Sequence, residues 1–448
     1  MKKVITYGTF DLLHYGHIQL LKRARALGDY LIVGVTADDF DKVRGKINVQ
    51  QSLMERIEAV KKTGLADKII IEEYLGQKID DIKKYHADIF TVGSDWTGHF
   101  DYLKDYCQVV YLPRTEGVSS SEIRAEKRKL RIGMVGEELS FLEKFYRESR
   151  YVNGIDVVGL CSRKKDSLPA SLQDLSCITD NYDELLDHVD AVYLISHPLR
   201  HNEQIRKALM KHRHVLCESP IVIDVKEYES LVRLADKQGC ILVDALRTAY
   251  STAYARLLVL VQSGIIGTVV SVDATCTSLR YVDFSKKKEA GNIWNSITAW
   301  GPTAMLPVLQ ILGSSYREKT IVSRLASEDP LYDDFTKVDF LYPHAAASIK
   351  VGKGVKSEGE LIISGTKGYV YVPAPWWKTD YFETRFENME DNKRYFYQLD
   401  GEGIRYELVA FSKAIEQGGN ASYISHDISK TIIQVLQDFY SGKSRVDI

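Results

Sequence analysis

Short apolar runs alternate with segments of helical periodicity along roughly the first 125 residues of this chain of 448 residues. Repeated βα units of this kind predict a parallel sheet with helices on both faces, because each crossover helix packs back onto the sheet. Ligands of such sheets bind beyond the carboxyl ends of the strands. The expected strands cover residues 4–7, 30–35, 68–71, 89–92 and 109–112, and the expected helices cover residues 17–27, 52–62 and 78–85.

A second series of strands and helices begins at residue 130, and from about residue 255 the pattern changes to longer β-rich runs. A chain of this length exceeds what one hydrophobic core supports. We therefore expect three domains, covering residues 1–128, 129–250 and 251–448. The expected class is α/β: a Rossmann-like domain, a second Rossmann domain, and an α+β domain with a large open, mostly antiparallel sheet. The charged residues 121–129 predict a helix that closes the first domain and serves as a linker.

The bulk properties exclude several classes of function. A net charge of −2 gives no electrostatic reason to expect a nucleic-acid partner or an anionic membrane partner. No apolar run approaches the roughly 20 residues that cross a bilayer, and the N-terminus enters a predicted strand without a signal-peptide pattern. The six cysteines lie far apart and form no CxxC pair. We expect a cytoplasmic protein with reduced, buried thiols, no membrane insertion and no zinc site.

The strongest local signal is a glycine-bearing turn between the first predicted strand and the first predicted helix, with the sequence Tyr7-Gly8-Thr9-Phe10-Asp11-Leu12-Leu13-His14-Tyr15-Gly16-His17. Such a turn lets a nucleotide approach the backbone, and the helix N-terminus offers unpaired N–H groups to phosphate. His14 and His17 are three residues apart, so one helical turn brings both imidazoles to the same ligand. The pattern predicts a phosphate-handling site rather than two unrelated histidines.

This segment is similar to the HxGH cytidylyltransferases, and the similarity continues along the whole first domain. Val92-Gly93-Ser94-Asp95-Trp96, Phe100-Asp101-Tyr102-Leu103, and the long segment from Leu112 to Ile123 all match the family pattern. The combination most resembles the glycerol-3-phosphate cytidylyltransferases of wall-polymer synthesis, over about residues 1–128. Three departures are mild: Tyr15 stands where tryptophan is usual, Ser94 where aspartate is common, and Ser119, Ser120 and Ser121 keep the hydroxyls of the late segment.

The resemblance implies a role for individual residues. The implied catalytic residues are His14, His17, Lys46 and Arg114, and the implied nucleotide- and substrate-binding residues are Gly8, Thr9, Phe10, Asp11, Arg56, Asp95, Thr115, Ser119 and Ser120. Two alternatives stay open: Arg56 as an arginine on a helix surface, and Asp95 as a loop cap. No carboxylate cage for a metal is visible, so we expect Mg²⁺ to arrive with CTP.

The implied reaction transfers CMP from CTP to a polyol phosphate, giving a CDP-polyol and pyrophosphate for teichoic acid or capsule synthesis. An anionic phosphate nucleophile needs no strong base, so catalysis rests on positioning and charge neutralisation. The acceptor stays open: glycerol-3-phosphate leads, followed by ribitol phosphate, glycerol-2-phosphate and phosphoethanolamine. A non-enzymatic binding or assembly protein is the alternative from another class.

Residues 130–448 resemble the glucose–fructose oxidoreductase/inositol dehydrogenase family. The resemblance rests on residues 130–136, 190–195, His201, 214–220, 264–268 and 365–368. The departures from this family lie at the positions that it uses for cofactor binding and catalysis. Counted from Gly136, the G-x-G-x-x-G fingerprint has Glu138 and Phe141 where its second and third glycines are expected. The family's Glu-Lys-Pro is Glu218-Ser219-Pro220 here. Residues 291–299 lack the Asp and the His that the family has in this stretch.

These losses make NAD(P) binding doubtful and predict a non-catalytic scaffold that forms a homodimer. Two alternatives stay open for this part of the chain. The first alternative is a reductase that makes the polyol phosphate for the first domain. The second is an enzyme that catalyses some other reaction. Binding of a nicotinamide cofactor would separate the scaffold from the reductase.

Overall fold

The computed structural model of the protein describes residues 1–37, 49, 51–74, 76–113, 129–152, 154–279, 295–327, 329–397, 399–419 and 423–448. The chain divides into two compact units, Met1–Lys129 and Leu130–Ile448. Among the described helices, none combines the length and the apolar character that a membrane crossing requires.

The first unit contains a five-stranded parallel sheet, as the sequence predicts. Its strands are β1 (Lys3–Gly8), β2 (Tyr30–Thr36), β3 (Lys68–Glu72), β4 (Ile89–Gly93) and β5 (Gln108–Leu112), in the order β3-β2-β1-β4-β5. The chain builds outward from β1 in one direction and then crosses to β4, so the order reverses between these two strands. This reversal opens a crevice beyond their carboxyl ends, where parallel α/β sheets bind ligands.

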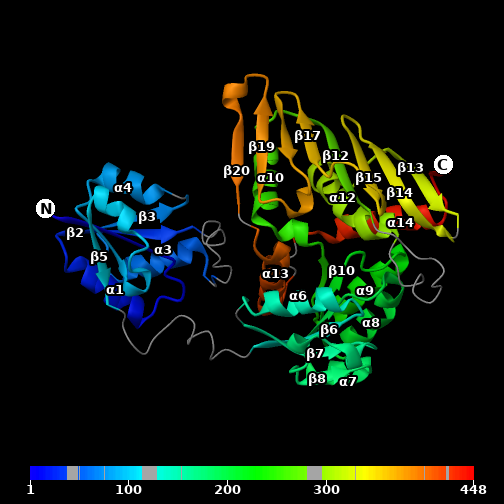
Figure 1. Ribbon diagram of the computed structural model, residues 1–448, viewed down its shortest axis with the longest axis horizontal. Coiled ribbons are helices and arrows are strands. Elements are labelled where there is room, and N and C mark those ends of the chain that lie inside the picture. Colours follow the sequence, from blue (N-terminus) through cyan, green and yellow to red (C-terminus); the bar gives the residue numbers. More distant parts are fainter. Residues whose placement is uncertain are drawn as a thin grey trace. The chain divides into compact units, whose positions relative to one another are not determined.

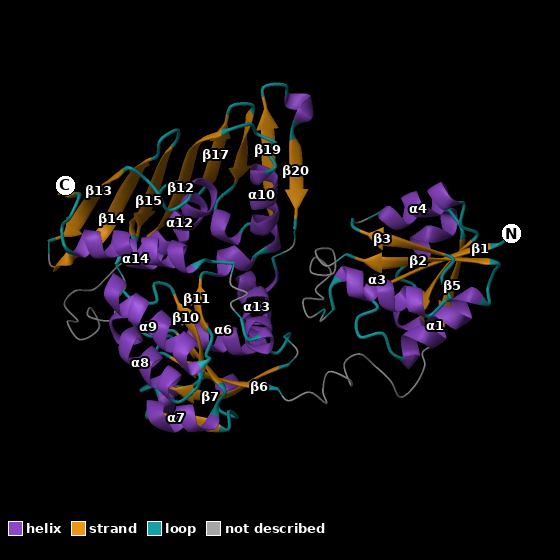
Figure 2. Cartoon of the chain, turned by 180° about the vertical axis from the view of Figure 1, so that it is seen from behind, coloured by secondary structure: helices purple, strands orange, loops and turns teal. Residues whose placement is uncertain are grey.

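Helices cover both faces of this sheet (Figures 1 and 2). Helices α1 (Tyr15–Arg25) and α3 (Leu53–Lys62) bury Leu21 and Val60 against one face, together with the core of β1 and β2. Helix α4 (Gln77–Tyr85) buries Ile82 against the other face. Two short 3₁₀ turns, η1 (Ser94–Trp96) and η2 (Asp101–Asp105), follow β4.

The second unit begins with a six-stranded parallel sheet. Its strands are β6 (Leu130–Val135), β7 (Ile155–Cys161), β8 (Cys177–Thr179), β9 (Ala191–Leu194), β10 (His214–Glu218) and β11 (Leu242–Ala245), in the order β11-β10-β9-β6-β7-β8. The crossover helices are α6 (Leu139–Ser149), α7 (Tyr182–His188), α8 (Pro198–Met210) and α9 (Val225–Gln238). The sheet is a doubly wound Rossmann sheet, and its order reverses between β6 and β9.

A ten-stranded sheet forms the rest of this unit. Its strands are β12 (Val269–Leu279), β13 (Glu318–Ala326), β14 (Asp329–Leu341), β15 (Ala346–Gly352), β16 (Gly354–Val355), β17 (Leu361–Gly365), β18 (Gly368–Val372), β19 (Tyr381–Phe386), β20 (Lys393–Phe396) and β21 (Arg445–Asp447). Most pairings are antiparallel, as predicted. Two are not, because β12 pairs with β15 and β13 with β21 in parallel, so the sheet is mixed.

Helices tie the two sheets of the second unit together. Helix α12 (Ser296–Leu312) packs on β12, β14 and β15, and α10 (Thr252–Gln262) packs against β19. The late helices α13 (Ile404–Gln417) and α14 (His426–Tyr440) return to the Rossmann half, where α13 contacts α6 and α14 contacts α9 (Figure 2). Ile433 of α14 belongs to the same apolar core as the strands β9 and β10.

Candidate functional site

The glycine-bearing turn of the first unit joins β1 to α1 at the switch point of the sheet. His14 is the N-cap of α1, with extended backbone, and its Nδ1 accepts a hydrogen bond of 3.1 Å from the amide of Gly16. The His14 amide in turn donates to Nδ1 of His17, over a longer distance of 3.5 Å. The two histidines therefore build a capping box, a role that Ser or Thr and Glu usually fill.

The two imidazoles stack on one another, with ring centroids 3.9 Å apart and planes 22° from parallel. Because both Nδ1 atoms accept from backbone amides, the ring proton of each neutral histidine lies on Nε2. The capping box thus selects one tautomer for both rings and presents two N–H donors at the positive end of a helix. This arrangement suits an anion with several oxygens.

A second feature of the turn is its strained backbone over a buried aromatic ring. Phe10 and Leu12 both adopt positive φ, 54° and 48°, which non-glycine residues rarely do. Phe10 is only 1% exposed and belongs to the core of β1 and α1. A Cβ atom added to Gly8 would lie 3.0 Å from two ring atoms of Phe10. The predicted binding role of Phe10 therefore concerns its backbone, since its ring is packed in the core.

Arg56 is fully buried, so the alternative of an arginine on a helix surface is wrong. Its guanidinium donates to the carbonyl of Thr9 at 2.7 Å, to that of Thr36 at 2.8 Å and to that of Gln51 at 3.1 Å. These carbonyls belong to the turn after β1, the end of β2 and the residue before the N-cap of α3. A charged hydrogen bond to each carbonyl fixes three segments around the site.

Asp11 and Thr9 are also largely buried, at 4% and 8% exposure. The Asp11 carboxylate accepts from the amide of Gln51 at 3.0 Å, and the Gln51 side chain accepts from the amide of Leu12 at 2.8 Å. Asp95 is exposed in η1, directly after β4 and next to β1 in the sheet. The turn after β1 and the turn after β4 therefore flank the same crevice.

Five predicted site residues lie outside the described residues: Lys46, Arg114, Thr115, Ser119 and Ser120. The helix expected over residues 121–129 also lies outside them, apart from residue 129. The described part of the site comprises Gly8, Thr9, Phe10, Asp11, His14, His17, Arg56 and Asp95. Within the described ranges, no group of three or more His, Cys, Asp or Glu side chains could hold a metal ion.

Sequence reasoning missed a buried charged cluster at the same edge of the sheet. Glu72, at the end of β3, is fully buried and pairs with Lys78 of α4. The Lys78 ammonium also lies 4.7 Å from the ring centroid of Tyr7, whose hydroxyl donates to Asp81 at 2.8 Å. Charged residues in the first turns of a helix predict a solvated face, so no sequence signal marks this cluster. Only the close approach of α4 to the strand ends buries it.

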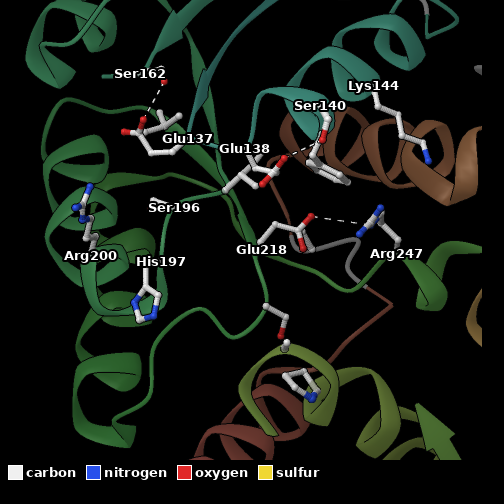
Figure 3. Close-up of a pocket in the computed structure, with 18 of the residues that line it drawn as sticks. Glu137, Glu138, Ser140, Lys144, Ser162, Ser196, His197, Arg200, Glu218 and Arg247 are labelled. Atoms are coloured by element: carbon white, nitrogen blue, oxygen red, sulfur yellow. Dashed lines mark hydrogen bonds and ion pairs between the residues drawn. The ribbon is translucent and has the colours of Figure 1, made fainter. Parts of the chain in front are cut away.

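The second unit contains a cleft of about 1640 Å³ at the carboxyl ends of the Rossmann strands, and residues of α12 and of η6 (Trp376–Lys378) line its other side. Figure 3 shows ten of its residues with labels. Its cofactor half is lined by the turn after β6 and by residues 162–164 after β7. Its inner half is lined by Glu218, Ser219 and Arg247 together with Trp300 and Trp377. The place matches the ligand crevice of doubly wound sheets.

The cofactor half departs from the dinucleotide-binding fingerprint. The turn after β6 reads Gly136-Glu137-Glu138, with side chains where the fingerprint needs close backbone approach. The Glu137 carboxylate accepts from the Ser162 hydroxyl at 3.2 Å and from Nε of Arg163 at 3.1 Å, so it lies against the groups that follow β7 (Figure 3). Two carboxylates at this turn oppose the charge of a pyrophosphate.

In the inner half, the described side chains differ from those that the resembling family uses for redox chemistry. Ser219 lines the cleft where the resembling family has lysine, and α12 presents Ala299 and Thr303, four residues apart, to the cleft. Residues 295–299, the described part of the stretch 291–299, contain neither the Asp nor the His of the resembling family. Residues 291–294 themselves lie outside the described residues.

Several carboxyl groups lie close together beside this inner half of the cleft. Glu218 faces the cleft between the Tyr193 hydroxyl, which donates to it, and Arg247, whose Nε lies 3.9 Å away (Figure 3). Burial, and then the charge of Glu218, raises the pKa of Glu407 well above its usual value. Burial also raises the pKa of Asp244 to about 6. Burial therefore favours the protonated form of Glu407.

The comparisons with known proteins find different relatives for the two units. The cytidylyltransferase-like family profile matches residues 5–126. Glycerol-3-phosphate cytidylyltransferase of Staphylococcus aureus is 49% identical over 131 residues, which are 28% of this chain and 95% of that protein. The enzyme of the same name from Bacillus subtilis is 50% identical over 126 residues, 28% of this chain and 97% of its own length.

The second unit matches oxidoreductases. The profile of the oxidoreductase family with an NAD-binding Rossmann fold covers residues 130–245. A 3-ketoreductase from Actinomadura kijaniata, solved with NADP and TDP-benzene, is similar with a TM-score of 0.63 and 18% identity, covering 71% of this chain and 99% of its own. An aldose-aldose oxidoreductase from Caulobacter crescentus gives 0.60 and 18%, over 70% and 98%. At these identities the similarity shows the fold alone.

Proposed function

Because the chain belongs to the cytidylyltransferase family through its first unit, and is on that ground a nucleotidyltransferase, we propose that it transfers CMP from CTP to glycerol-3-phosphate. The products are CDP-glycerol and pyrophosphate. The relatives that carry this activity in their names match the first unit over nearly their whole length. Supply of an activated polyol for teichoic acid or capsule synthesis is the role that this product suits. Because CTP is its substrate, we expect the protein to work in the cytoplasm.

The described residues support a mechanism of positioning and charge neutralisation. The phosphate oxygen of the acceptor attacks the α-phosphorus of CTP, the bond to the β-phosphate oxygen breaks, and pyrophosphate leaves with the electron pair. The Nε2–H groups of His14 and His17 donate to the phosphate oxygens as charge builds up. The amino end of α1 adds its dipole. Mg²⁺ is expected to neutralise the leaving pyrophosphate when it is bound with CTP.

Residues beyond the imidazoles would complete the site. Lys46, Arg114, Thr115, Ser119 and Ser120 are proposed to hold the triphosphate, since cations and hydroxyls in the matching family segments suit it. Thr9, Asp11 and Asp95 are proposed to contact the nucleotide or the acceptor at the crevice between β1 and β4. Arg56 is proposed to position the turn after β1, because it donates to the carbonyl of Thr9.

The stacked pair of histidines, with one tautomer selected by the capping box, is the observation that carries this proposal. Pyrophosphate release from CTP, Mg²⁺ and a panel of acceptors tests it. The panel contains glycerol-3-phosphate, glycerol-2-phosphate, ribitol phosphate and phosphoethanolamine. We expect turnover with glycerol-3-phosphate, and at least tenfold less with phosphoethanolamine. An absence of turnover with every acceptor would contradict the proposal and favour a binding or assembly protein.

For the second unit we propose a scaffold that performs no NAD(P)-dependent redox reaction and pairs two copies of the chain. Ser219 in the cleft, and the lack of Asp and His over residues 295–299, support this proposal. The alternative, a reductase that makes the polyol phosphate, is favoured by the oxidoreductase fold alone. A thermal-shift assay with NADH and NADPH separates the two, because a bound cofactor raises the melting temperature. Stabilisation at near-physiological cofactor concentrations would overturn the scaffold and favour the reductase.

A further inference from the structure

The cofactor half of the second unit's cleft contains two adjacent carboxylates at positions where a dinucleotide would place its own anions. We infer that Glu137 and Glu138 act as built-in anions that occupy the phosphate-binding positions of this Rossmann half. This inference rests on the proposed absence of redox chemistry and explains it. It also identifies what the site would bind if the two glutamates were removed.

The first position lies directly after β7. Three consecutive residues gather a hydroxyl, a backbone amide, a guanidinium and an ammonium around Glu137. The carboxylate accepts from the Ser162 hydroxyl at 3.2 Å, from the Arg163 amide at 3.4 Å and from Arg163 Nε at 3.1 Å. The Lys164 ammonium donates to the carbonyl of Glu137 at 2.9 Å. Glu137 therefore engages every one of these donor groups.

The composition of this donor set points to a phosphate. In doubly wound folds, the residues after the second strand contact the ribose, and an arginine there accommodates a 2′-phosphate. A guanidinium and an ammonium together suit a dianion better than they suit one carboxylate. The Ser162 side chain is buried, at 2% exposure, so its hydroxyl has a fixed place. The ligand class of the vacated position would thus be a nucleotide with a 2′-phosphate, such as NADPH.

The second position lies at the amino end of α6, where the pyrophosphate of a dinucleotide sits. Glu138 is the N-cap residue of α6 and its side chain caps no backbone amide. Its carboxylate instead accepts from the hydroxyl of Ser140, in the first turn of the helix, at 2.8 Å (Figure 3). A negative side chain is thereby held beside the positive end of the helix, where it satisfies the dipole.

Apart from Glu137 and Glu138, the described cleft lining has seven lysines and arginines but three carboxylates, those of Asp180, Glu218 and Glu402. Arg200 and Asp180 line the same half, and the Arg163–Glu137 pair is partly exposed, with side chains 59% and 32% accessible. Such an exposed pair is weakly bound by itself. Because the rest of the lining is mostly cationic, exclusion of a dinucleotide arises only at the phosphate positions themselves, where Glu137 occupies the donors after β7 and Glu138 adds a like charge and side-chain bulk.

Calorimetric titration of the full chain tests the inference, with NADPH, NADH, 2′,5′-ADP and 5′-AMP as ligands at up to about 1 mM. The variants are Glu137→Ala, the double variant Glu137→Ala/Glu138→Gly, and the double variant with Arg163→Ala added. Glu203→Ala is the matched control, because it removes a carboxylate of the same domain that is not among the residues lining the cleft. Thermal unfolding shows whether each variant folds.

We expect no saturable binding by the wild type or the control. The double variant should bind NADPH and 2′,5′-ADP at least tenfold more tightly than the wild type, and more tightly than it binds NADH and 5′-AMP. Addition of Arg163→Ala should remove that preference. Saturable NADPH binding by the wild type that is as tight as in the double variant would overturn both this inference and the proposed absence of a cofactor. A folded double variant that binds none of the ligands would overturn this inference alone.

Pyrophosphate release from CTP and glycerol-3-phosphate, measured on the same samples, should be unchanged in every variant. A loss of that activity in the double variant would overturn the inference, because the two glutamates would then serve the transferase reaction rather than the cleft.

Discussion

His14 performs two tasks that a single substitution can separate. Its Nδ1 caps α1 by accepting from the Gly16 amide, and its Nε2–H is proposed to donate to the phosphates of CTP. In His14→Asn, the amide oxygen keeps the cap but the ring donor is lost, whereas His14→Ala loses both. Loss of a helix N-cap costs about 1 kcal/mol. We expect His14→Ala to lower the melting temperature of the first unit by roughly 3–5 °C and His14→Asn to leave it nearly unchanged.

The two variants should nevertheless lose activity alike. Removal of one donor to a developing oxyanion typically lowers kcat about 10²–10³-fold, so both should fall by at least this factor in pyrophosphate release at saturating CTP. Turnover of His14→Asn within tenfold of wild type would refute a role in phosphate binding and leave the cap as the whole function. Equal melting temperatures for wild type and His14→Ala would refute the cap.

Three further predictions concern packing, positioning and ionisation. Gly8→Ala places a Cβ 3.0 Å from the buried ring of Phe10 and should lower the free energy of unfolding, measured in urea, by about 1–3 kcal/mol. Gly93→Ala is the control and should lower it far less, because its Cβ would meet nothing within 4 Å. In Arg56→Lys the ammonium cannot reach three carbonyls at once, so the free energy of unfolding should fall by roughly 2–4 kcal/mol. Faster hydrogen exchange in peptides around the turn after β1 would show this loss. Burial raises the pKa of Asp244 to about 6, so the folded state keeps a proton that the unfolded state releases between about pH 4 and pH 6. Stability of the second unit should therefore fall as pH rises through that window, and Asp244→Asn should remove this decline in thermal melts.

The alternation of apolar and helical segments predicted the fold correctly because parallel α/β sheets bury each strand completely and each helix on one side. The strands expected at residues 4–7 and 89–92 lie within β1 and β4. The parallel pairing of β12 with β15 was not predicted. Strand direction within a mixed sheet depends on pairing across long sequence separations, which local periodicity does not contain.

The candidate sites divide in the same way. The spacing of His14 and His17 fixed their shared helical turn, but the cap that selects their tautomer follows from backbone geometry around His14. Arg56 gave no sign in the sequence that it would be fully buried. The substitutions Glu138 and Ser219 were visible in the sequence, whereas the contacts of Glu137 with Ser162 and Arg163 were not.

The sequence by itself determined the order of the elements, the two family resemblances, and which side chains follow which strands. These depend on residue type and on spacing along the chain. The tertiary structure decided which of those side chains share a site, because strands far apart in sequence bring their carboxyl ends to one edge. It also decided that Lys78 lies buried beside Glu72 and that Glu137 lies against the residues after β7. Burial and charge pairing depend on how segments approach in space, and no local pattern specifies that approach.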